Sequence, residues 1–328
     1  MNIDKKTETL LEVKDLHISF TTRQGELRAV NGINYTVRKG EVMGLVGESG
    51  SGKTVEAFSI MGLLNPPANI TNGNIYYNNK DILTLTKKEM GEFRGGEISM
   101  IFQNPMSYLD PVFTVEQQMV ETIRAHDKKV AKAAARTRSI DMLREVNIRN
   151  PDQVMALYPF ELSGGMQQRI MIAIALLCDP KLLIADEPTT ALDVTIQAQI
   201  IQILKKLQKQ RGMAMVYITH NFGIVAELCD KVSVMYGGYI LEQGTTDDIF
   251  YQTAHPYTKM LMKTIPRMDA IDNEPLAPIG GVPADPTALP DGCVFHPRCS
   301  YCKDICRREF PPETILTPNH SANCWRLD

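Results

Sequence analysis

The chemistry of this chain is concentrated first in a glycine-rich segment. Residues 47–54 read GESGSGKT, which matches the phosphate-binding pattern of spaced glycines followed by a lysine and a hydroxyl residue. Glycines let the backbone turn tightly enough for its N–H groups to surround phosphate oxygens where a helix begins. The expected phosphate contacts are Gly47, Ser49, Gly50, Ser51, Gly52, Lys53 and Thr54. The lysine would place a positive charge on the β and γ phosphates, and the Thr54 hydroxyl would be a ligand of Mg²⁺.

A second group of chemical residues follows an apolar run later in the chain. Residues 181–185 read KLLIA and predict a buried strand, which ends in the carboxylates of Asp186 and Glu187. The carboxyl end of such a strand is where an α/β sheet binds its ligands. We expect Asp186 to coordinate magnesium through water and Glu187 to accept a proton from an attacking water molecule.

A third segment, LSGGMQQR at residues 162–169, precedes the acidic pair by about two turns of helix and a loop. A hydroxyl residue and two glycines at the start of a helix expose free backbone N–H groups at a positive dipole end. Locally this pattern is explained equally well by an ordinary helix cap and by a second anion-binding site.

The elements that must position these residues follow the pattern of an α/β protein with a parallel sheet. Strands are predicted over 11–20, 34–37, 41–46, 98–102, 181–185 and 213–219, and helices over 53–64 and 166–177. Strands that alternate with helices favour a parallel core. Residues 104–165 are helix-rich and are expected to form a helical subdomain.

Composition excludes several classes of function. The 328 residues carry a formal net charge of −3, so no overall basic field attracts the chain to nucleic acid or to an anionic membrane. The N-terminus lacks the apolar core of a secretory signal, and no apolar run approaches the roughly 18 residues of a membrane span. We therefore expect a soluble protein of the cytosol.

The complete string LSGGMQQR is similar to the signature motif of the ATP-binding cassette (ABC) ATPases, and other motifs of that family match by position. The resemblance implies that Gln103 contacts magnesium and the attacking water, that His220 contacts the γ phosphate and that Asp193 crosses to a partner subunit. It also implies that Ser163, Gly164, Gly165 and Gln167 serve the nucleotide held by a partner. Phe20 is the candidate for stacking on adenine.

The resemblance narrows from about residue 11 to the C-terminus. DVTIQAQI at residue 193, HPYTKML at residue 255 and GCVFHPRC at residue 292 resemble the D-type ATPase subunits of bacterial dipeptide and oligopeptide importers. The family implies a head-to-tail dimer, with a paralogous ATPase as the expected partner, whose closure drives two membrane permeases. It further implies an extracytoplasmic peptide-binding protein, and a peripheral location on the cytoplasmic face of the membrane.

Five of the seven cysteines are crowded into the last 36 residues, at positions 293, 299, 302, 306 and 324. In a reducing cytosol, this crowding indicates metal or cluster binding before disulfides. Short spacing alone would favour Cys299, Cys302 and Cys306. The family pattern instead implies Cys293, Cys299, Cys306 and Cys324 as ligands of a [4Fe-4S] cluster. Zinc stays open as an alternative, because four thiolates bind zinc as well as an iron–sulfur cluster. Free thiols without any metal are the remaining alternative.

Together these patterns predict a nucleotide-binding domain over residues 1–250 and an extension over 251–328, with a proline-rich arm from 266 to 290. The leading hypothesis is an ATPase that powers peptide import. The alternatives are an importer ATPase for nickel or another solute, and a soluble ABC switch protein that acts on ribosomes or DNA. The chain shows one phosphate loop and no extended heptads, whereas such switch proteins usually carry two cassettes or a long coiled coil.

Overall fold

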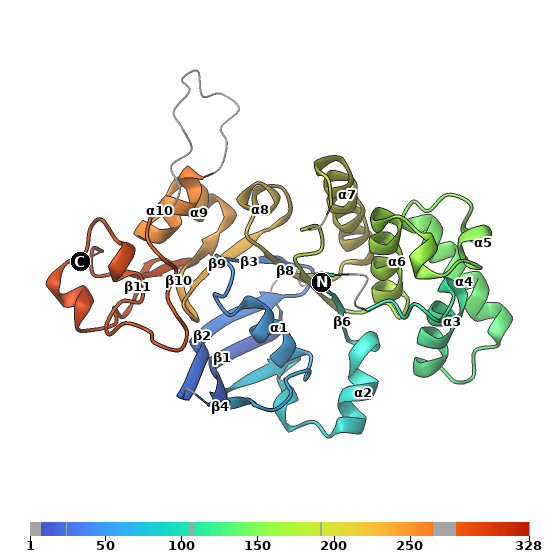
Figure 1. The fold of residues 1–328 in the computed structure, drawn as a ribbon, viewed down its shortest axis with the longest axis horizontal. Coiled ribbons are helices and arrows are strands. Elements are labelled where there is room, and N and C mark those ends of the chain that lie inside the picture. Colours follow the sequence, from blue (N-terminus) through green and yellow to red (C-terminus); the bar gives the residue numbers. More distant parts are fainter. Residues whose placement is uncertain (1–7, 24, 105–107, 191, 265–279, 328) are drawn as a thin grey trace, which may run out of the picture. The chain divides into compact units, whose positions relative to one another are not determined.

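The computed structural model describes residues 8–23, 25–104, 108–190, 192–264 and 280–327 (Figure 1). These residues divide into two units. The first unit is Thr84–Tyr217 with Glu8 and Arg38–Gly40. The second unit is Thr9–Val37, Glu41–Leu83 and the described residues from Ile218 to the C-terminal end.

The second unit contains a four-stranded sheet in the order β2-β1-β4-β5. Its strands are β1 (Thr9–Thr22), β2 (Gly25–Arg38), β4 (Ala68–Tyr77) and β5 (Lys80–Asp81). Alternation along β1 places Leu11, Val13 and Ile18 in the interior, and β1 pairs with β4 in an antiparallel register. Two expected strands, 11–20 and 34–37, are therefore parts of longer strands.

The same unit holds five further strands in the order β11-β12-β10-β9-β3. β3 (Val42–Val46) is fully buried and pairs in parallel with β9 (Lys231–Tyr236). β10 (Tyr239–Thr245), β11 (Glu313–Thr317) and β12 (His320–Asn323) continue the sheet by antiparallel pairing. Four helices accompany these strands: α1 (Lys53–Ile60), α8 (Phe222–Leu228), α9 (Thr246–Tyr251) and α10 (Pro256–Lys263).

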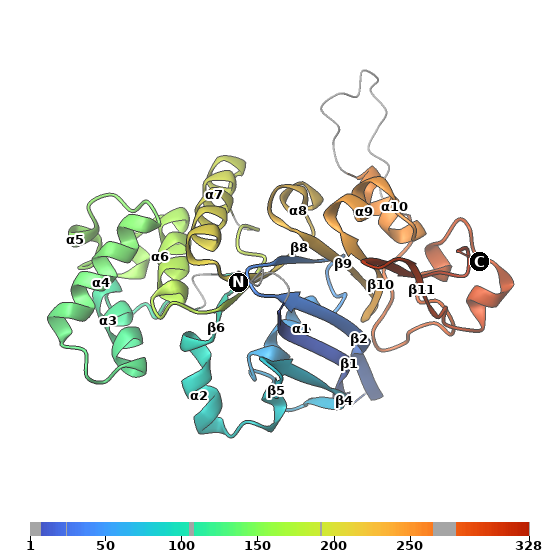
Figure 2. The ribbon, with the colours of Figure 1, turned by 180° about the vertical axis from the view of Figure 1, so that it is seen from behind.

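The first unit is built from a few buried strands and a larger set of helices. β6 (Ile98–Ile101) and β7 (Leu182–Asp186) pair in parallel, and β8 (Ala214–Thr219) adjoins β7 and crosses the unit boundary. The helices are α2 (Lys87–Gly96), α3 (Val115–His126), α4 (Lys132–Glu145), α5 (Pro151–Val154), α6 (Gly164–Leu176) and α7 (Val194–Arg211). α3, α5 and α6 gather around α4 (Figure 2).

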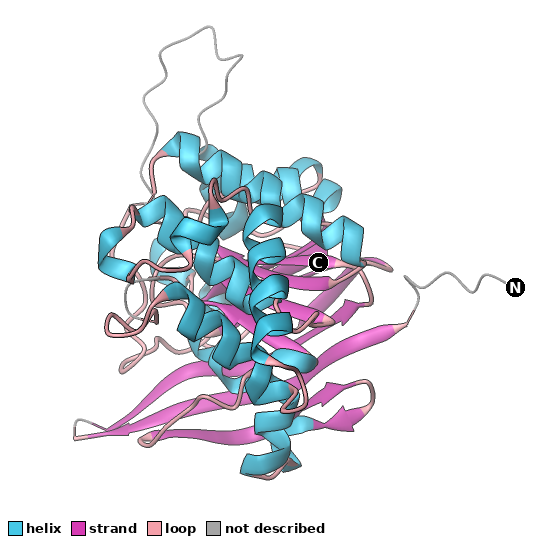
Figure 3. Cartoon of the chain, turned by 90° about the vertical axis from the view of Figure 1, so that its right-hand side faces the viewer, coloured by secondary structure: helices cyan, strands magenta, loops and turns pink. Residues whose placement is uncertain are grey.

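The expected parallel core is confirmed for the pairs β6–β7 and β3–β9, while the expectation of a simple parallel sheet was incomplete. The strands that went unrecognised are β4, β5, β9, β10, β11 and β12. All strands are drawn in magenta in Figure 3. β4 contains Asn69, Asn72 and Gly73, which weaken the strand pattern in the sequence. Pairing with β1 overrides that weak local preference.

Two helices differ in their bounds from the prediction: one ends earlier and the other begins earlier. α1 stops at Ile60, before Pro66, instead of extending to residue 64. α6 starts at Gly164 because the Ser163 side chain caps the helix there. Much of the expected proline-rich arm, residues 266–279, lies outside the described residues. Within the described ranges, no helix has the length and apolar character needed to cross a membrane.

Candidate functional site

The phosphate-type loop connects β3 to α1 in the second unit, as the sequence predicts. Gly50 and Gly52 have φ angles of 78° and 102°, which are conformations that favour glycine. A Cβ atom on Gly52 would lie 2.3 Å from the Ala29 carbonyl oxygen, and one on Gly47 would lie 2.1 Å from the Met235 carbonyl oxygen. These glycines are therefore required by the fold of the loop itself.

Lys53 points back into this loop from the first turn of α1. Its Nζ donates to the carbonyl oxygens of Gly47 at 2.8 Å and Glu48 at 2.9 Å, and it lies 3.3 Å from Ser51 Oγ. The lysine is only 5% exposed, whereas Ser49 and Gly50 are exposed at the tip of the loop. Thr54 follows in the first turn of the helix, half-buried. The loop thus places an ammonium group beside backbone N–H groups that begin a helix, which suits phosphate binding.

In the first unit, the acidic pair lies at the carboxyl end of β7. Asp186 is 2% exposed, and Glu187 has a φ angle of 42°, which is strained for a residue with a side chain. Gln103, which follows β6, donates through Nε2 to Glu187 Oε2 at 3.1 Å. Thr190 Oγ1 donates to the same oxygen at 2.8 Å. The parallel pairing of β6 with β7 therefore brings together two side chains that the sequence assigned to one reaction.

The segment LSGGMQQR begins α6 in the first unit. Ser163 is the N-cap, and its Oγ accepts a hydrogen bond from Met166 N at 3.4 Å, while Gly164 and Gly165 form the first turn. Gln167 is 3% exposed, and its Nε2 donates to the carbonyl oxygens of Pro159 and Leu162. The glutamine is thus directed into the interior of this unit, and its expected nucleotide contact stays a prediction.

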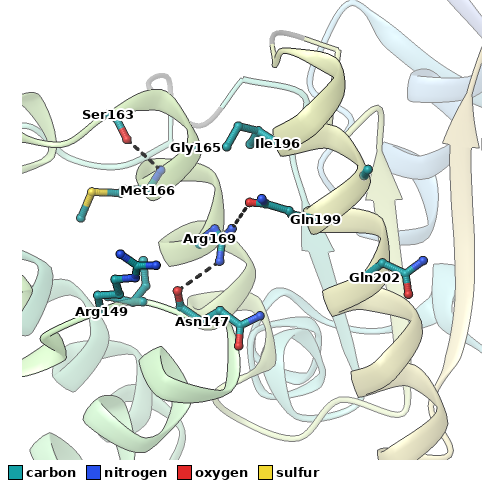
Figure 4. A pocket seen from close by; sticks show the side chains of 11 residues that line it. Asn147, Arg149, Ser163, Gly165, Met166, Arg169, Ile196, Gln199 and Gln202 are labelled. Carbon is teal, nitrogen blue, oxygen red and sulfur yellow. Dashed lines mark hydrogen bonds between the residues drawn. The ribbon is translucent and has the colours of Figure 1, made fainter.

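A pocket of about 760 Å³ lies beside this helix start, between α6 and α7 (Figure 4). Ser163, Gly165 and Met166 line one side, and Ile196 and Gln199 line the other. Arg169 crosses between the helices, where it donates to Gln199 Oε1 at 2.7 Å and to the Asn147 carbonyl at 3.1 Å. Burial lowers the pKa of this arginine from its ordinary value.

Three other expected site residues are placed by different elements. Asp193 is the N-cap of α7, and its carboxylate accepts from Ile196 N at 3.0 Å, so local capping accounts for its position. His220 follows β8 in the second unit and is exposed. Phe20 lies half-buried in β1. Their contacts with nucleotide or partner stay predictions.

Four of the cysteines line one narrow cavity of about 20 Å³ in the second unit, namely Cys293, Cys299, Cys306 and Cys324. Cys302 does not line it, and its sulfur is directed toward the Lys303 carbonyl. Burial raises the pKa of Cys293 to about 12 and also raises the pKa values of Cys299 and Cys324. Across the described ranges, no group of three or more His, Cys, Asp or Glu side chains has the arrangement of a metal site. The donor types suit a metal, but their present spacing does not.

Sequence reasoning missed the partners that hold the site residues. Thr190 adjoins the acidic motif and could have been found from its hydroxyl, which is three residues from Glu187. Glu48 is an unspecified position of the phosphate-binding pattern, yet it makes a partly buried ion pair with Arg298, 250 residues away. No local sequence pattern indicates that this pair forms.

Comparison with known proteins gives the site its context. Residues 30–190 match the family model described as ABC transporter, and residues 241–306 match the model described as oligopeptide/dipeptide transporter, C-terminal region. The chain is 48% identical over 322 residues to the dipeptide transport ATP-binding protein DppD of Bacillus subtilis, covering 98% of this chain and 96% of that protein. It is 46% identical over 322 residues to the oligopeptide transport ATP-binding protein OppD of Escherichia coli, covering 98% and 94%.

A solved structure supports the fold. The ATP-binding cassette MJ0796, in a dimeric post-hydrolysis state bound to ADP and Pi, aligns with a TM-score of 0.65 and 26% identity. The alignment covers 72% of this chain and 99% of that one. With identity this high across nearly the whole length of the transport proteins, the chain belongs to the ABC transporter ATP-binding family that includes DppD and OppD.

Proposed function

We propose that this chain is the ATP-hydrolysing subunit that powers import of dipeptides or oligopeptides through a membrane ABC transporter. The observation that carries the proposal is similarity to peptide-transport ATPases over 98% of the chain, including the region specific to oligopeptide and dipeptide transporters. ATP is the substrate of this family, and the phosphate loop has the glycines and lysine that such a substrate requires.

The chemistry assigned to the chain is hydrolysis of the γ phosphate. Lys53 neutralises phosphate charge, and Glu187 accepts the proton of the attacking water, with Gln103 orienting that carboxylate or the water beside it. Thr54, Asp186 and Gln103 are the residues proposed to hold Mg²⁺, which when bound screens the charge of the phosphates. His220 is assigned to the γ phosphate, and Phe20 to the adenine.

The proposed unit of action is a head-to-tail dimer that closes on ATP. The start of α6, with Ser163, Gly164 and Gly165, offers backbone N–H groups to the nucleotide of the partner, and Asp193 lies at the neighbouring crossing loop. Gln167 would support this surface from within, since its side chain holds the carbonyl groups that precede the helix. The pocket beside Ser163 is consistent with a ligand approaching this face.

The proposed partners are a second, paralogous ATPase, two membrane permeases and an extracytoplasmic peptide-binding protein, with the chain peripheral to the cytoplasmic face of the membrane. We keep 1–250 as the proposed nucleotide-binding domain, with its helical subdomain near 104–165, and 251–328 as the extension. The match of residues 241–306 to the transporter C-terminal region supports a separate C-terminal extension, and the boundary at residue 250 stays a prediction.

For the cysteine-rich extension we propose a [4Fe-4S] cluster held by Cys293, Cys299, Cys306 and Cys324. Its support is that these four thiols, and not Cys302, border one cavity. The spacing of the side chains would have to contract around the cluster, which when bound would stabilise a segment rich in proline and poor in apolar core. Anaerobic purification with absorbance near 400 nm and iron and zinc analysis tests this assignment. One mole of zinc per chain, or neither metal, would overturn it.

The transport function is tested by reconstitution. The chain would be expressed with candidate permeases and a second ATPase, and uptake of labelled dipeptide, longer peptide and nickel would be measured with and without ATP. We expect ATP-dependent peptide uptake and stimulation of ATP hydrolysis by the permeases. ATP-dependent nickel uptake alone, or co-purification with ribosomes in place of membrane proteins, would favour the alternative functions.

A further inference from the structure

Glu48, the second residue of the phosphate loop, is held by the C-terminal part of the second unit. Arg298 Nη1 donates to Glu48 Oε2 at 2.6 Å, and Arg298 Nη2 donates to Glu48 Oε1 at 3.0 Å. This is a two-pronged pairing of a planar guanidinium with a carboxylate, which fixes both direction and distance. A surface ion pair would do neither reliably.

The pair is largely sheltered from solvent, and the guanidinium makes further hydrogen bonds besides those to Glu48. The Arg298 side chain is 3% exposed and that of Glu48 is 23% exposed. Arg298 also donates to the Gly280 carbonyl at 2.9 Å and lies 3.3 Å from the Tyr236 hydroxyl. Burial alone would lower the pKa of the guanidinium, but its bonds to Glu48 and Tyr236 raise it above the ordinary value. Removing one partner of such a sheltered pair leaves the other charge without compensation.

The backbone of Glu48 is held as firmly as its side chain. Its N–H donates to the Tyr257 hydroxyl at 3.0 Å, and its carbonyl accepts from Lys53 Nζ at 2.9 Å. Tyr257 is fully buried, and its ring packs against those of Tyr236 and Phe295. The conformation at the start of the phosphate loop is therefore set by side chains more than 200 residues later.

Arg298 is itself positioned by the cysteine-rich segment. It ends a short 3₁₀ turn, His296–Arg298, and its backbone N–H donates to the Phe295 carbonyl. Cys299 follows directly, and Cys293 N donates to the Cys306 carbonyl across the same segment. Any change that loosens this segment also loosens the guanidinium that grips Glu48.

We propose that Arg298 is a positioning residue of the phosphate loop, which couples ATP affinity to the folded state of the cysteine-rich segment. The inference rests on the proposed function, in that the loop binds ATP. Two effects act together. Arg298 orients the loop through Glu48, and it neutralises a carboxylate that would otherwise repel the phosphates of an anionic nucleotide.

The experiment measures binding of a fluorescent ATP analogue with Mg²⁺ to the full chain. We expect Arg298→Gln to raise Kd about five- to tenfold, corresponding to about 1 kcal/mol. The matched control is Arg308→Gln, which removes another tail arginine, one that is exposed and does not line the cysteine cavity. We expect Kd of that variant to stay within twofold of wild type.

A double-mutant cycle separates positioning from general loss of structure. In a Glu48→Gln background the carboxylate is gone, so Arg298→Gln should change Kd less than threefold. Equal tenfold losses in both backgrounds would overturn the proposal, as would a Kd for Arg298→Gln equal to that of the Arg308 control. Melting temperature reports folding for each variant. If Arg298→Gln does not fold, Arg298→Lys takes its place, because lysine keeps the charge and loses the two-pronged geometry.

This outcome is distinguishable from failure of the proposed function. A wild-type chain that does not bind the ATP analogue would contradict the function itself. A wild-type chain that binds and hydrolyses ATP, with Arg298 variants indistinguishable from it, would contradict only the coupling.

Discussion

Glu48 and Glu187 are two glutamates that each follow a buried strand, and the structure treats them differently. Glu187 comes directly after β7, and its Oε2 accepts hydrogen bonds from the amide of Gln103 and the hydroxyl of Thr190. Glu48 comes two residues after β3 and is gripped by the guanidinium of Arg298. Neutral donors leave a carboxylate its charge and orient it, whereas an arginine fork neutralises it.

This difference in partners indicates a catalytic role for Glu187 and a structural role for Glu48. An oriented carboxylate with neutral donors suits a general base, which must be able to accept a proton. A carboxylate that is neutralised by an arginine suits a residue whose role is to hold the backbone in position. The phosphate loop and the acidic motif therefore use the same residue type for different purposes, and only the partners of each glutamate show which purpose it serves.

The largest effect is expected from Glu187→Gln. The amide keeps the shape but cannot accept the proton, so the rate of ATP hydrolysis should fall at least about 100-fold with Kd for ATP nearly unchanged. Steady-state phosphate release and analogue binding measure the two quantities. Glu48→Gln is the matched control, and its turnover should fall less than fivefold. A similar loss of ATP hydrolysis in both variants would show that the two carboxylates do not have different roles.

The two carboxylates also differ in how far they could be predicted from sequence. Glu187 was assigned because it follows the apolar run 181–185, and Gln103 because its position matches a glutamine of the ABC ATPase family. Pairing of the two strands that precede them brings these side chains together. The phosphate loop was predictable because its whole pattern lies in one short segment, although Gly47 and Gly52 also allow the close approach of the Met235 and Ala29 carbonyl oxygens. These sites depend on contacts close in the chain or on adjacent strands.

Glu48 could not be assigned in this way, because its partner lies 250 residues away in a segment with little regular structure. β4 was missed for a related reason, as its stability comes from pairing with β1 and not from local pattern. β9 and β10 do carry a local signal, since two apolar runs are joined by Gly237 and Gly238, and that hairpin signal went unrecognised. The cysteines were an intermediate case. Their crowding was visible, and the structure separates Cys302 from the other four by the cavity that they line.

The second prediction concerns a substitution in the cysteine-rich segment near Arg298. Cys293→Ser removes a buried thiol from the shared cavity, so the segment should loosen and Kd for ATP should rise about fivefold, approaching the Arg298→Gln value. Cys302→Ser is the control and should leave Kd within twofold, because that sulfur lies outside the cavity. Nucleotide binding and iron content are measured on the same preparations. If the two serine variants bind ATP equally, the cysteine-rich segment does not govern the loop.

The third prediction concerns the other carboxylate. Thr190→Ala removes the hydroxyl that donates to Glu187, a change worth about 1 kcal/mol or roughly a fivefold loss of turnover. Thr190→Ser keeps the hydroxyl and should retain most of the rate. We expect Kd for ATP to be unaffected in both, since Thr190 orients the base and not the phosphates. A change in Kd without a change in turnover would show that Thr190 acts on binding.

The smallest effect is expected from Tyr257→Phe, which keeps the ring packing on Tyr236 and Phe295 and removes only the hydroxyl that accepts from Glu48 N–H. Only one hydrogen bond between neutral groups is lost, at a cost of about 0.5 kcal/mol, so Kd should rise only two- to threefold. The Arg298 pair still holds the side chain. Because both contacts fix one residue, Tyr257→Phe combined with Arg298→Gln should cost more than the sum of the single changes, as backbone and side chain would then both be released. Strict additivity would mean that the hydroxyl and the guanidinium act on the loop independently, and that Glu48 is not the point at which they meet.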